Sequence, residues 1–475
     1  MRPTIATRPT RLLRLIALSV ALGILAWARF VEAQAQCPNP PPVVTNVPQP
    51  PADVCLPPNV PGVPFQFFDD FSWRSFVAMV WPALDGQRGM PDTSKSVGGS
   101  GPRVFETYKA LAEVFHNDGS APSAWNDFDP PSQNPCGVQI KFGDLVLASF
   151  SKFSNLGQAG FGTLVGPLVA QNRTYVRFAT SFNQTEFTGI MNGKWFLRSN
   201  IPAAGVTFSN GSIDIKSAWI DVAGIKNPQR FYTRSATVLD PQSGKCAQTM
   251  VGLVGLHIVQ KTPTRPQWIW TTFEQVDNVP GSGAQSPFTF NNGSGTPMPS
   301  KNPFPINPLP LPTPAPFNVS RVKPISPSTQ ATNAAYQKAL SGTPWQFYQL
   351  VMTQWPLCLP TCDPSMRGTP GNTFPGNGAT TAFANTTLET FDQASIFTGC
   401  MACHNVTQTV SGVQNGTDFL WSLKDHAFPP NVPDLLFADS FRQLQSLLSK
   451  SGIPPAQARA AAQRDKTMIN KTSKK

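Results

Sequence analysis

A pentapeptide near the carboxyl end, Cys400-Met401-Ala402-Cys403-His404, combines residue types that could do chemistry together. Its C-x-x-C-H spacing is the attachment signature of c-type haem. Two thiols at this spacing can reach the two vinyl groups on one edge of a porphyrin, and the adjacent His can supply an axial nitrogen to the iron. We therefore predict one covalent haem c, attached through Cys400 and Cys403, with His404 as the proximal iron ligand.

Two other uses of a C-x-x-C pair fit the surrounding sequence less well. A redox dithiol prefers the junction of a strand and a helix, but the preceding segment, 395–399, is short and irregular. A structural zinc site needs a second close pair of ligands, and none lies nearby in the sequence. The surroundings of the motif therefore favour haem.

The amino end has the pattern of an export signal. Four Arg precede residue 15, an apolar run covers 15–28, and Ala33-Gln34-Ala35 is a small-x-small cleavage site. The run is shorter than the ~20 residues that a membrane span needs. We therefore expect a signal peptide over 1–35, cleaved after Ala35 with Ala33 as the alternative. The mature chain would be periplasmic or secreted and would have no membrane span, which agrees with haem attachment outside the bacterial cytoplasm.

The charge of the chain is modestly positive once the leader is removed. Loss of five Arg and one Glu lowers the formal net charge from +11 to +7. We expect the basic tail, 451–475, to be disordered and solvated, and we expect no nucleic-acid partner. The remaining excess charge is compatible with docking to an acidic redox partner protein.

The identity of the sixth iron ligand stays open at this stage. Besides His404 the chain has three His: His116, His257 and His426. The only Met after the motif is Met468, in the predicted disordered tail, so a Met-ligated carrier of the small cytochrome fold is disfavoured. His257 lies in an apolar strand and is the first candidate distal ligand, whereas His426 follows the motif by 22 residues and is the second. Met352 or an open position are the remaining alternatives, and His116 is expected to be exposed at a helix end.

Six cysteines remain outside the motif: Cys37, Cys55, Cys136, Cys246, Cys358 and Cys362. An even number in an exported chain predicts three disulfides. Sequence alone does not determine the pairing. Nearest-neighbour pairing is our hypothesis: Cys37 with Cys55, Cys136 with Cys246, and Cys358 with Cys362.

Periodicity predicts an α+β fold, with a β-rich antiparallel body and a small helical c-type haem segment near the C-terminus. Helices are expected over 72–82, 104–115, 333–340, 345–355, 386–393, 418–425 and 435–448. Strands are expected over 145–150, 174–178, 213–222, 231–238, 251–259 and 268–273. After the leader, the expected organisation is a Pro-rich lead (36–64), the body (65–300), a Pro-rich linker (301–330), helices and a loop (331–384), the haem segment (385–450) and the tail (451–475).

Three stretches of the chain, together with the motif, resemble a group of known proteins. Phe71–Ala78, Gly255–Pro280 and Ala384–Asn405 are similar to large exported bacterial monohaem proteins described as cytochrome c family proteins. The resemblance covers most of the mature chain. It implies haem binding and electron transfer and brings no defined substrate.

The sequence therefore predicts an extracytoplasmic monohaem c-type cytochrome that carries out one-electron transfer. It contains no H-E-x-x-H, G-x-S-x-G, phosphate-loop or dinucleotide motif. Two alternatives stay open. The first is a haem enzyme, a peroxidase or oxygenase, with an open distal position. The second is a haem sensor or a structural subunit of a redox complex.

Overall fold

A computed structural model describes residues 38, 40–57, 65–134, 136–147, 168–240, 245–294, 318–357, 369–370, 384–393, 399–404, 407 and 416–429. Its strands are β1 Lys109–Ala110, β2 Val146–Leu147, β3 Arg177–Phe182, β4 Ile213–Asp221, β5 Thr233–Leu239, β6 Cys246–Thr262, β7 Arg265–Gln275, β8 Tyr348–Gln354, β9 Pro356–Leu357 and β10 Thr369–Pro370. Its α-helices are α2 Phe65–Met79, α3 Leu111–Val114, α4 Gln184–Gly193, α5 Pro327–Ala339, α6 Cys400–His404 and α7 Trp421–His426. Within these residues, strands β1 to β8 form one eight-stranded sheet, and β9 pairs with β10.

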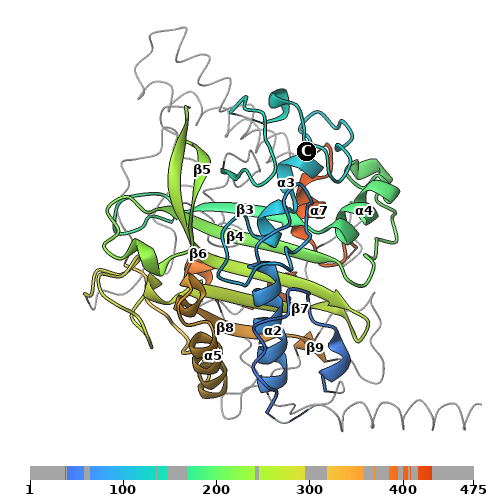
Figure 1. The fold of residues 1–475 in the computed structure, drawn as a ribbon. Coiled ribbons are helices and arrows are strands. Elements are labelled where there is room, and N and C mark those ends of the chain that lie inside the picture. The colour runs from blue at the N-terminus through green and yellow to red at the C-terminus, as the bar shows by residue number, and fades with distance from the viewer. Residues whose placement is uncertain are drawn as a thin grey trace, which may run out of the picture.

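The long strand β6 organises the sheet (Figure 1). One of its edges pairs with β4, from Gln260 to Val251. Its other edge is shared, because β5 pairs with residues 246–252 and β7 with residues 255–262. Strand β8 continues beyond β7, and β3 and β1 continue beyond β4. These pairs are antiparallel, and β2 joins β5 in parallel. The expected β-rich α+β class is confirmed.

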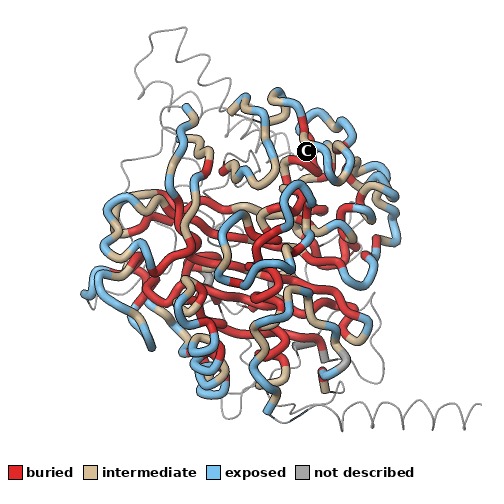
Figure 2. The backbone as a smooth tube through the Cα atoms, in the orientation of Figure 1, coloured by how far each residue is buried: buried red, intermediate tan, exposed pale blue. Residues whose placement is uncertain are grey.

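One face of the sheet is covered by α2 and α5, and we call it the helix face. Helix α2 contacts α5 and β8, and its Phe76 packs on Phe273 with a ring separation of 4.4 Å. The indole of Trp73 stacks on Tyr336 of α5 and donates to the amide oxygen of Asn333 at 2.9 Å. Figure 2 shows the strands as a buried band beneath these helices. Burying large aromatic side chains is the main favourable contribution of this layer to folding.

The opposite face carries Lys216, His257 and Thr272, and we call it the motif face. His257 of β6 is paired with Lys216 of β4 and with Thr272 of β7, so the three residues share one side of the sheet. Their neighbour Ile258 belongs to the core on the helix face. Helices α4, α6 and α7 pack on the motif face through a second apolar cluster that includes Trp268 and Trp270.

The predicted helix over 104–115 is wrong. The segment instead forms a short 3-10 turn (Val104–Thr107), strand β1 and the single turn α3. The buried Lys109 amine donates to the carbonyl oxygen of Asp127, and the Glu113 carboxylate holds Arg88 at 2.6 Å. Satisfying these buried charges and the pairing of β1 with β3 override the helical spacing of the apolar residues.

The predicted helix over 345–355 is also wrong. Pro344–Phe347 form a 3-10 turn, and Tyr348–Gln354 form strand β8, in which every residue is buried. A strand that is covered on both faces shows no polar alternation, so its sequence resembles that of a buried helix. Strand β8 belongs to the same sheet as β4 to β7. Its residues fall in 331–384, the segment that was expected to hold helices and a loop.

The boundaries of the other helices and strands agree only in part with those expected from the sequence. Helix α2 begins before the expected helix, at Phe65, and the expected strands over 213–222, 231–238, 251–259 and 268–273 are confirmed as β4 to β7, with β6 extended to 17 residues. Residues 386–393 form turns and the 3-10 turn Thr390–Asp392 rather than a helix. Helix α5 begins inside the expected linker, where Val319 is also buried. The leader, most of the linker, the helix over 435–448 and the tail lie outside the described residues.

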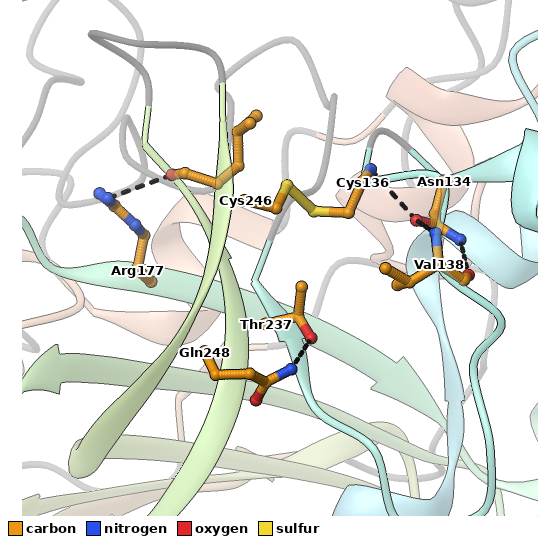
Figure 3. The surroundings of a disulfide bond; sticks show 8 residues. Asn134, Cys136, Val138, Arg177, Thr237, Cys246 and Gln248 are labelled. Carbon is orange, nitrogen blue, oxygen red and sulfur yellow. Dashed lines mark hydrogen bonds between the residues drawn. A yellow bond between two sulfur atoms is a disulfide. The ribbon is translucent and has the colours of Figure 1, made fainter.

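One predicted disulfide is confirmed (Figure 3). Cys136 is bonded to Cys246 at the start of β6, which ties a loop 110 residues distant to the sheet. The loop is ordered by Asn134, whose side chain accepts from the Cys136 amide and donates to the Val138 carbonyl. Cys55 is also disulfide-bonded. Cys37, Cys358 and Cys362 lie outside the described residues.

None of the described helices is long and apolar enough to cross a membrane.

Candidate haem site

The C-x-x-C-H pentapeptide forms helix α6 and is anchored on the motif face. The amide of Met401 donates to the side-chain oxygen of Gln354 in β8 at 2.9 Å. The Met401 side chain is buried in the cluster that also contains Trp268 and Trp270 of β7. Strands β7 and β8 therefore fix the position of the motif on the sheet.

The imidazole of His404 is oriented by two contacts. Its Nδ1 lies 2.7 Å from the carbonyl oxygen of Phe419, and its ring centroid lies 4.4 Å from that of Trp270. A carbonyl oxygen only accepts, so Nδ1 carries the proton and Nε2 keeps its lone pair in the neutral ring. A metal-binding His commonly donates its other ring N–H to a backbone carbonyl in this way.

Burial keeps the His404 ring neutral. Desolvation is the main cause that lowers the pKa of His404 to about 4, and electrostatic interactions with His257 and Lys216 lower it further. The Phe419 carbonyl and the Glu389 carboxylate act in the opposite direction. A neutral imidazole at pH 7 is the form that can donate Nε2 to a metal.

His257 is paired with a carboxylate from the same segment that leads to the motif. Its Nε2 lies 3.1 Å from Oε1 of Glu389. Burial raises the pKa of Glu389, but His257, Lys216 and the Asn385 amide outweigh it, and the pKa lies below its ordinary value. Because 29% of the Glu389 side chain is exposed, water screens part of this attraction. His257 and Glu389 thus form a polar pair on the motif face, and both act electrostatically on His404.

The segment that carries Glu389 is pressed against the sheet. The Asn385 amide group donates to the Thr272 hydroxyl at 3.0 Å and to the Phe273 carbonyl at 2.7 Å. A Cβ at Gly255 of β6 would lie 2.3 Å from the Thr387 hydroxyl. Glycine at this position therefore permits the close approach of the two backbones that places Glu389 beside His257.

The Phe419 carbonyl belongs to a strained turn. The Leu420 amide donates to the Thr417 carbonyl at 3.1 Å, and the two central residues, Asp418 and Phe419, have φ of 51° and 72°. Two consecutive positive φ values describe a type I′ turn, in which Asn-Gly is preferred. A bulky residue in this conformation costs about 1–3 kcal/mol, so the surrounding structure must hold it.

The structure brings only some of the predicted site residues together. Cys400 and Cys403 lie in α6 with His404, and His257 acts electrostatically on His404 across the motif face. His426 ends α7, where its ring centroid lies 6.3 Å from that of Phe115. Met352 is buried in β8 opposite Thr272, and Met468 lies outside the described residues.

The expectation of an exposed His116 is wrong. The residue is 6% exposed. Its Nε2 lies 2.9 Å from Asp129, and its Nδ1 lies 2.8 Å from the Ser120 hydroxyl. Because the predicted helix is absent, the chain folds back at His116 and buries it against the 123–129 loop.

Sequence reasoning missed several residues of the site. Lys216 and Glu389 carry no local signal, since each reaches the site through pairing or packing of distant segments. The Phe419 carbonyl lies only 15 residues beyond His404, but it meets the ring through a turn that the sequence does not indicate. The strand pattern around His257 was the one signal that could have indicated Lys216, because pairing β4 with β6 in register places Lys216 beside His257.

Comparison of the chain with protein-family models, curated proteins and solved structures found no match.

Proposed function

We propose that this protein is an extracytoplasmic monohaem c-type cytochrome that carries out one-electron transfer. The observation that carries the proposal is the hydrogen bond between His404 Nδ1 and the Phe419 carbonyl, within a C-x-x-C-H helix. It leaves Nε2 available as an axial ligand and fixes the ring orientation. The site residues of this chain therefore fit a haem c.

Each residue has a distinct role in the proposal. Cys400 and Cys403 would form thioether bonds, and His404 would supply the proximal nitrogen. Trp270 packs against the His404 ring and limits its rotation. A haem c bound here would supply an Fe(III)/Fe(II) couple that exchanges one electron with a partner.

A direct test is the haem content of the exported chain. A pyridine haemochrome assay on protein produced with the haem-attachment machinery should give one haem per chain that resists acid-acetone extraction. The Cys400→Ala/Cys403→Ala variant is the control and should lose the haem to extraction. Wild-type haem that extracts freely would falsify the covalent attachment.

We also propose His257 as the distal ligand, with His426 as the second candidate. The observation in favour of His257 is its position on the motif face, where it acts electrostatically on His404. His257→Ala should convert a low-spin spectrum to a high-spin one and keep the covalent haem. An unchanged spectrum in His257→Ala with a changed one in His426→Ala would reverse the assignment.

A second candidate function follows from the contact between His257 and Glu389. A His paired with a carboxylate is a proton donor and acceptor suited to general acid–base chemistry. If the wild-type spectrum is high-spin and binds cyanide readily, this pair would serve a haem enzyme, a peroxidase or oxygenase, with an open distal position. In that case Glu389→Gln should lower turnover and leave the haem content unchanged.

The proposal includes the location and partner expected from the sequence. The leader over 1–35 would direct export to the periplasm or beyond, and a redox partner protein would exchange electrons with the haem. Fractionation of cells that express the full chain tests the location, since the haem-bearing product should appear outside the cytoplasm without the leader.

A further inference from the structure

We infer that the buried ion pair between Lys261 and Asp418 is a positioning device for the proximal histidine. It holds the strained turn that aims the Phe419 carbonyl at His404 Nδ1. The inference deepens the proposed function and rests on it where the iron is concerned.

The turn needs an external support because Phe419, its second central residue, does not favour a positive φ. Asp418 and Phe419 both have positive φ, yet neither is glycine. Phe419 is 1% exposed and packs with Trp268, Trp270 and Leu423 in one apolar cluster. Packing therefore accounts for the side chain at this position, while the backbone conformation has to be held by other contacts.

Asp418 supplies those contacts through its carboxylate and its carbonyl. Its Oδ2 lies 2.5 Å from the Lys261 ammonium and accepts from the Phe208 amide at 2.8 Å. Its carbonyl oxygen accepts from the Trp268 indole at 3.1 Å. The peptide that precedes Phe419 is thus fixed from two strands and one loop, and the orientation of the following carbonyl is set with it.

Burial of the pair argues for a role other than stability. The side chains of Lys261 and Asp418 are 2% and 1% exposed, and burial lowers the pKa of Lys261 and raises that of Asp418. A buried ion pair is often no more stabilising than apolar residues of similar volume. The pair also lies near Glu186, a buried carboxylate that acts electrostatically on both partners and has neither oxygen hydrogen-bonded in the structure. A merely stabilising core would not need this concentration of buried ionisable groups.

The consequence for His404 follows from the hydrogen bond it makes. A well-aligned carbonyl acceptor draws the Nδ1 proton and increases the electron donation of Nε2. Stronger donation favours ferric over ferrous iron. Loosening the turn should therefore weaken the donation and raise the midpoint potential.

The test uses a charge-free double variant with a matched control. Lys261→Met/Asp418→Asn removes both charges together. The side-chain amide oxygen introduced at position 418 can still accept a hydrogen bond from the Phe208 backbone amide. Arg88→Met/Glu113→Gln removes a second buried pair that makes no contact with His404 in the described structure. Trp268→Phe is a milder variant that removes the hydrogen bond to the Asp418 carbonyl, keeps both charges of the pair and retains an aromatic ring.

The first readout is the midpoint potential of the haem-loaded full chain. The double variant should shift the ferric/ferrous equilibrium about tenfold toward ferrous iron, which is a rise of ~59 mV for one electron. Trp268→Phe should shift it in the same direction by a smaller factor. The Arg88/Glu113 control should stay within twofold of wild type.

The second readout does not need haem. The chain has four His, so ¹⁵N-histidine labelling of the full chain produced without the attachment machinery gives a simple spectrum. His404 should be a single tautomer with the proton on Nδ1 in wild type and in the control. The double variant should show a mixture of tautomers.

The two readouts separate the two claims. A wild-type chain without covalent haem, but with tautomers that change as described, would sink the proposed function and support the positioning role. A double variant that melts at a lower temperature but keeps both the potential and the Nδ1 tautomer would overturn the positioning role. If the double variant does not fold, Trp268→Phe decides by the same criteria.

Discussion

The two faces of the central sheet are built from the same strands but from different chemistry. On the helix face, residues such as Phe76, Ile258 and Phe273 form a dense apolar core. Polar groups within this core pair with one another, as in the hydroxyl contacts of Ser72 with Thr271 and Thr353 at 2.8 and 2.7 Å. On the motif face, the residues that alternate with this core include Lys216 and His257. Lys261 lies over the Trp268 ring of the motif-face cluster.

This difference indicates that buried polar groups on the motif face lower the free energy of unfolding. An unsatisfied buried polar group costs about 1–3 kcal/mol, and a buried charge costs more unless it is paired. The motif face holds both kinds, including Glu186 and the Lys261–Asp418 pair. Local departures from a consistently apolar core are expected at functional sites. The motif face is therefore where function is to be sought, while the helix face maintains the fold.

The largest expected effect tests the helix face. Phe76→Ala removes a fully buried ring that contacts Phe273, Trp345 and Tyr348, and should lower the free energy of unfolding by about 3–5 kcal/mol. Urea denaturation of the chain measures the loss. Val43→Ala, at a 40% exposed position, is the control and should change it little. A loss below about 1 kcal/mol for Phe76→Ala would contradict the assignment of this face as the main core.

A smaller effect concerns a titratable group on the helix face. Burial raises the pKa of Asp69 to about 7, although the Thr329 and Thr353 hydroxyls oppose the shift. The folded chain therefore holds a proton that the unfolded chain releases near pH 4, and its contribution to stability is lost as pH rises through 7. Relative to Asp69→Asn, the wild type should lose up to about 4 kcal/mol between pH 4 and pH 8, measured by urea unfolding at both values.

Asp118 is the control for this experiment, because its pKa is shifted in the opposite direction to that of Asp69. Hydrogen bonds from Ser120 lower the pKa of Asp118 to about 2 at an exposed position. Its contribution to the free energy of unfolding is present above pH 4 and is lost as the pH falls through 2. Equal pH dependence in wild type and Asp69→Asn would mean that the Asp69 carboxyl is not held neutral by burial.

The smallest expected effect is on the motif face. Burial is the main cause that raises the pKa of Glu186 well above its ordinary value, and Asp214 and Asp418 add to it. Burial thus favours the neutral carboxyl in the folded chain, and Glu186→Gln should change the free energy of unfolding by less than about 0.5 kcal/mol. Calorimetry or urea denaturation measures it. For comparison, Glu113→Gln breaks a buried ion pair with Arg88 and should cost several kcal/mol. A similar loss in both variants would show that Glu186 is ionised in the folded chain.

Local sequence determined the elements and residues that carry strong local patterns. The C-x-x-C-H spacing indicated the candidate ligands, alternation over 213–222 predicted β4, and parity of the cysteines predicted disulfides. The pairing of Cys136 with Cys246 was a nearest-neighbour hypothesis, which the structure confirms. These features depend on neighbours in the chain or on simple counting. The same local patterns failed for 345–355, because full burial of β8 removes the alternation that distinguishes a strand.

Tertiary structure alone decided which groups meet His404. The Phe419 carbonyl reaches it through a turn that Lys261 holds from another strand, and Glu389 reaches His257 because Gly255 allows the backbones to approach. The Lys261–Asp418 and His257–Glu389 contacts join segments more than a hundred residues apart, and their energies depend on burial and on the packing of both segments. Residue types and spacings therefore identify the candidate chemistry, whereas the hydrogen bonds and charges that tune it arise only when the sheet brings distant segments to one face.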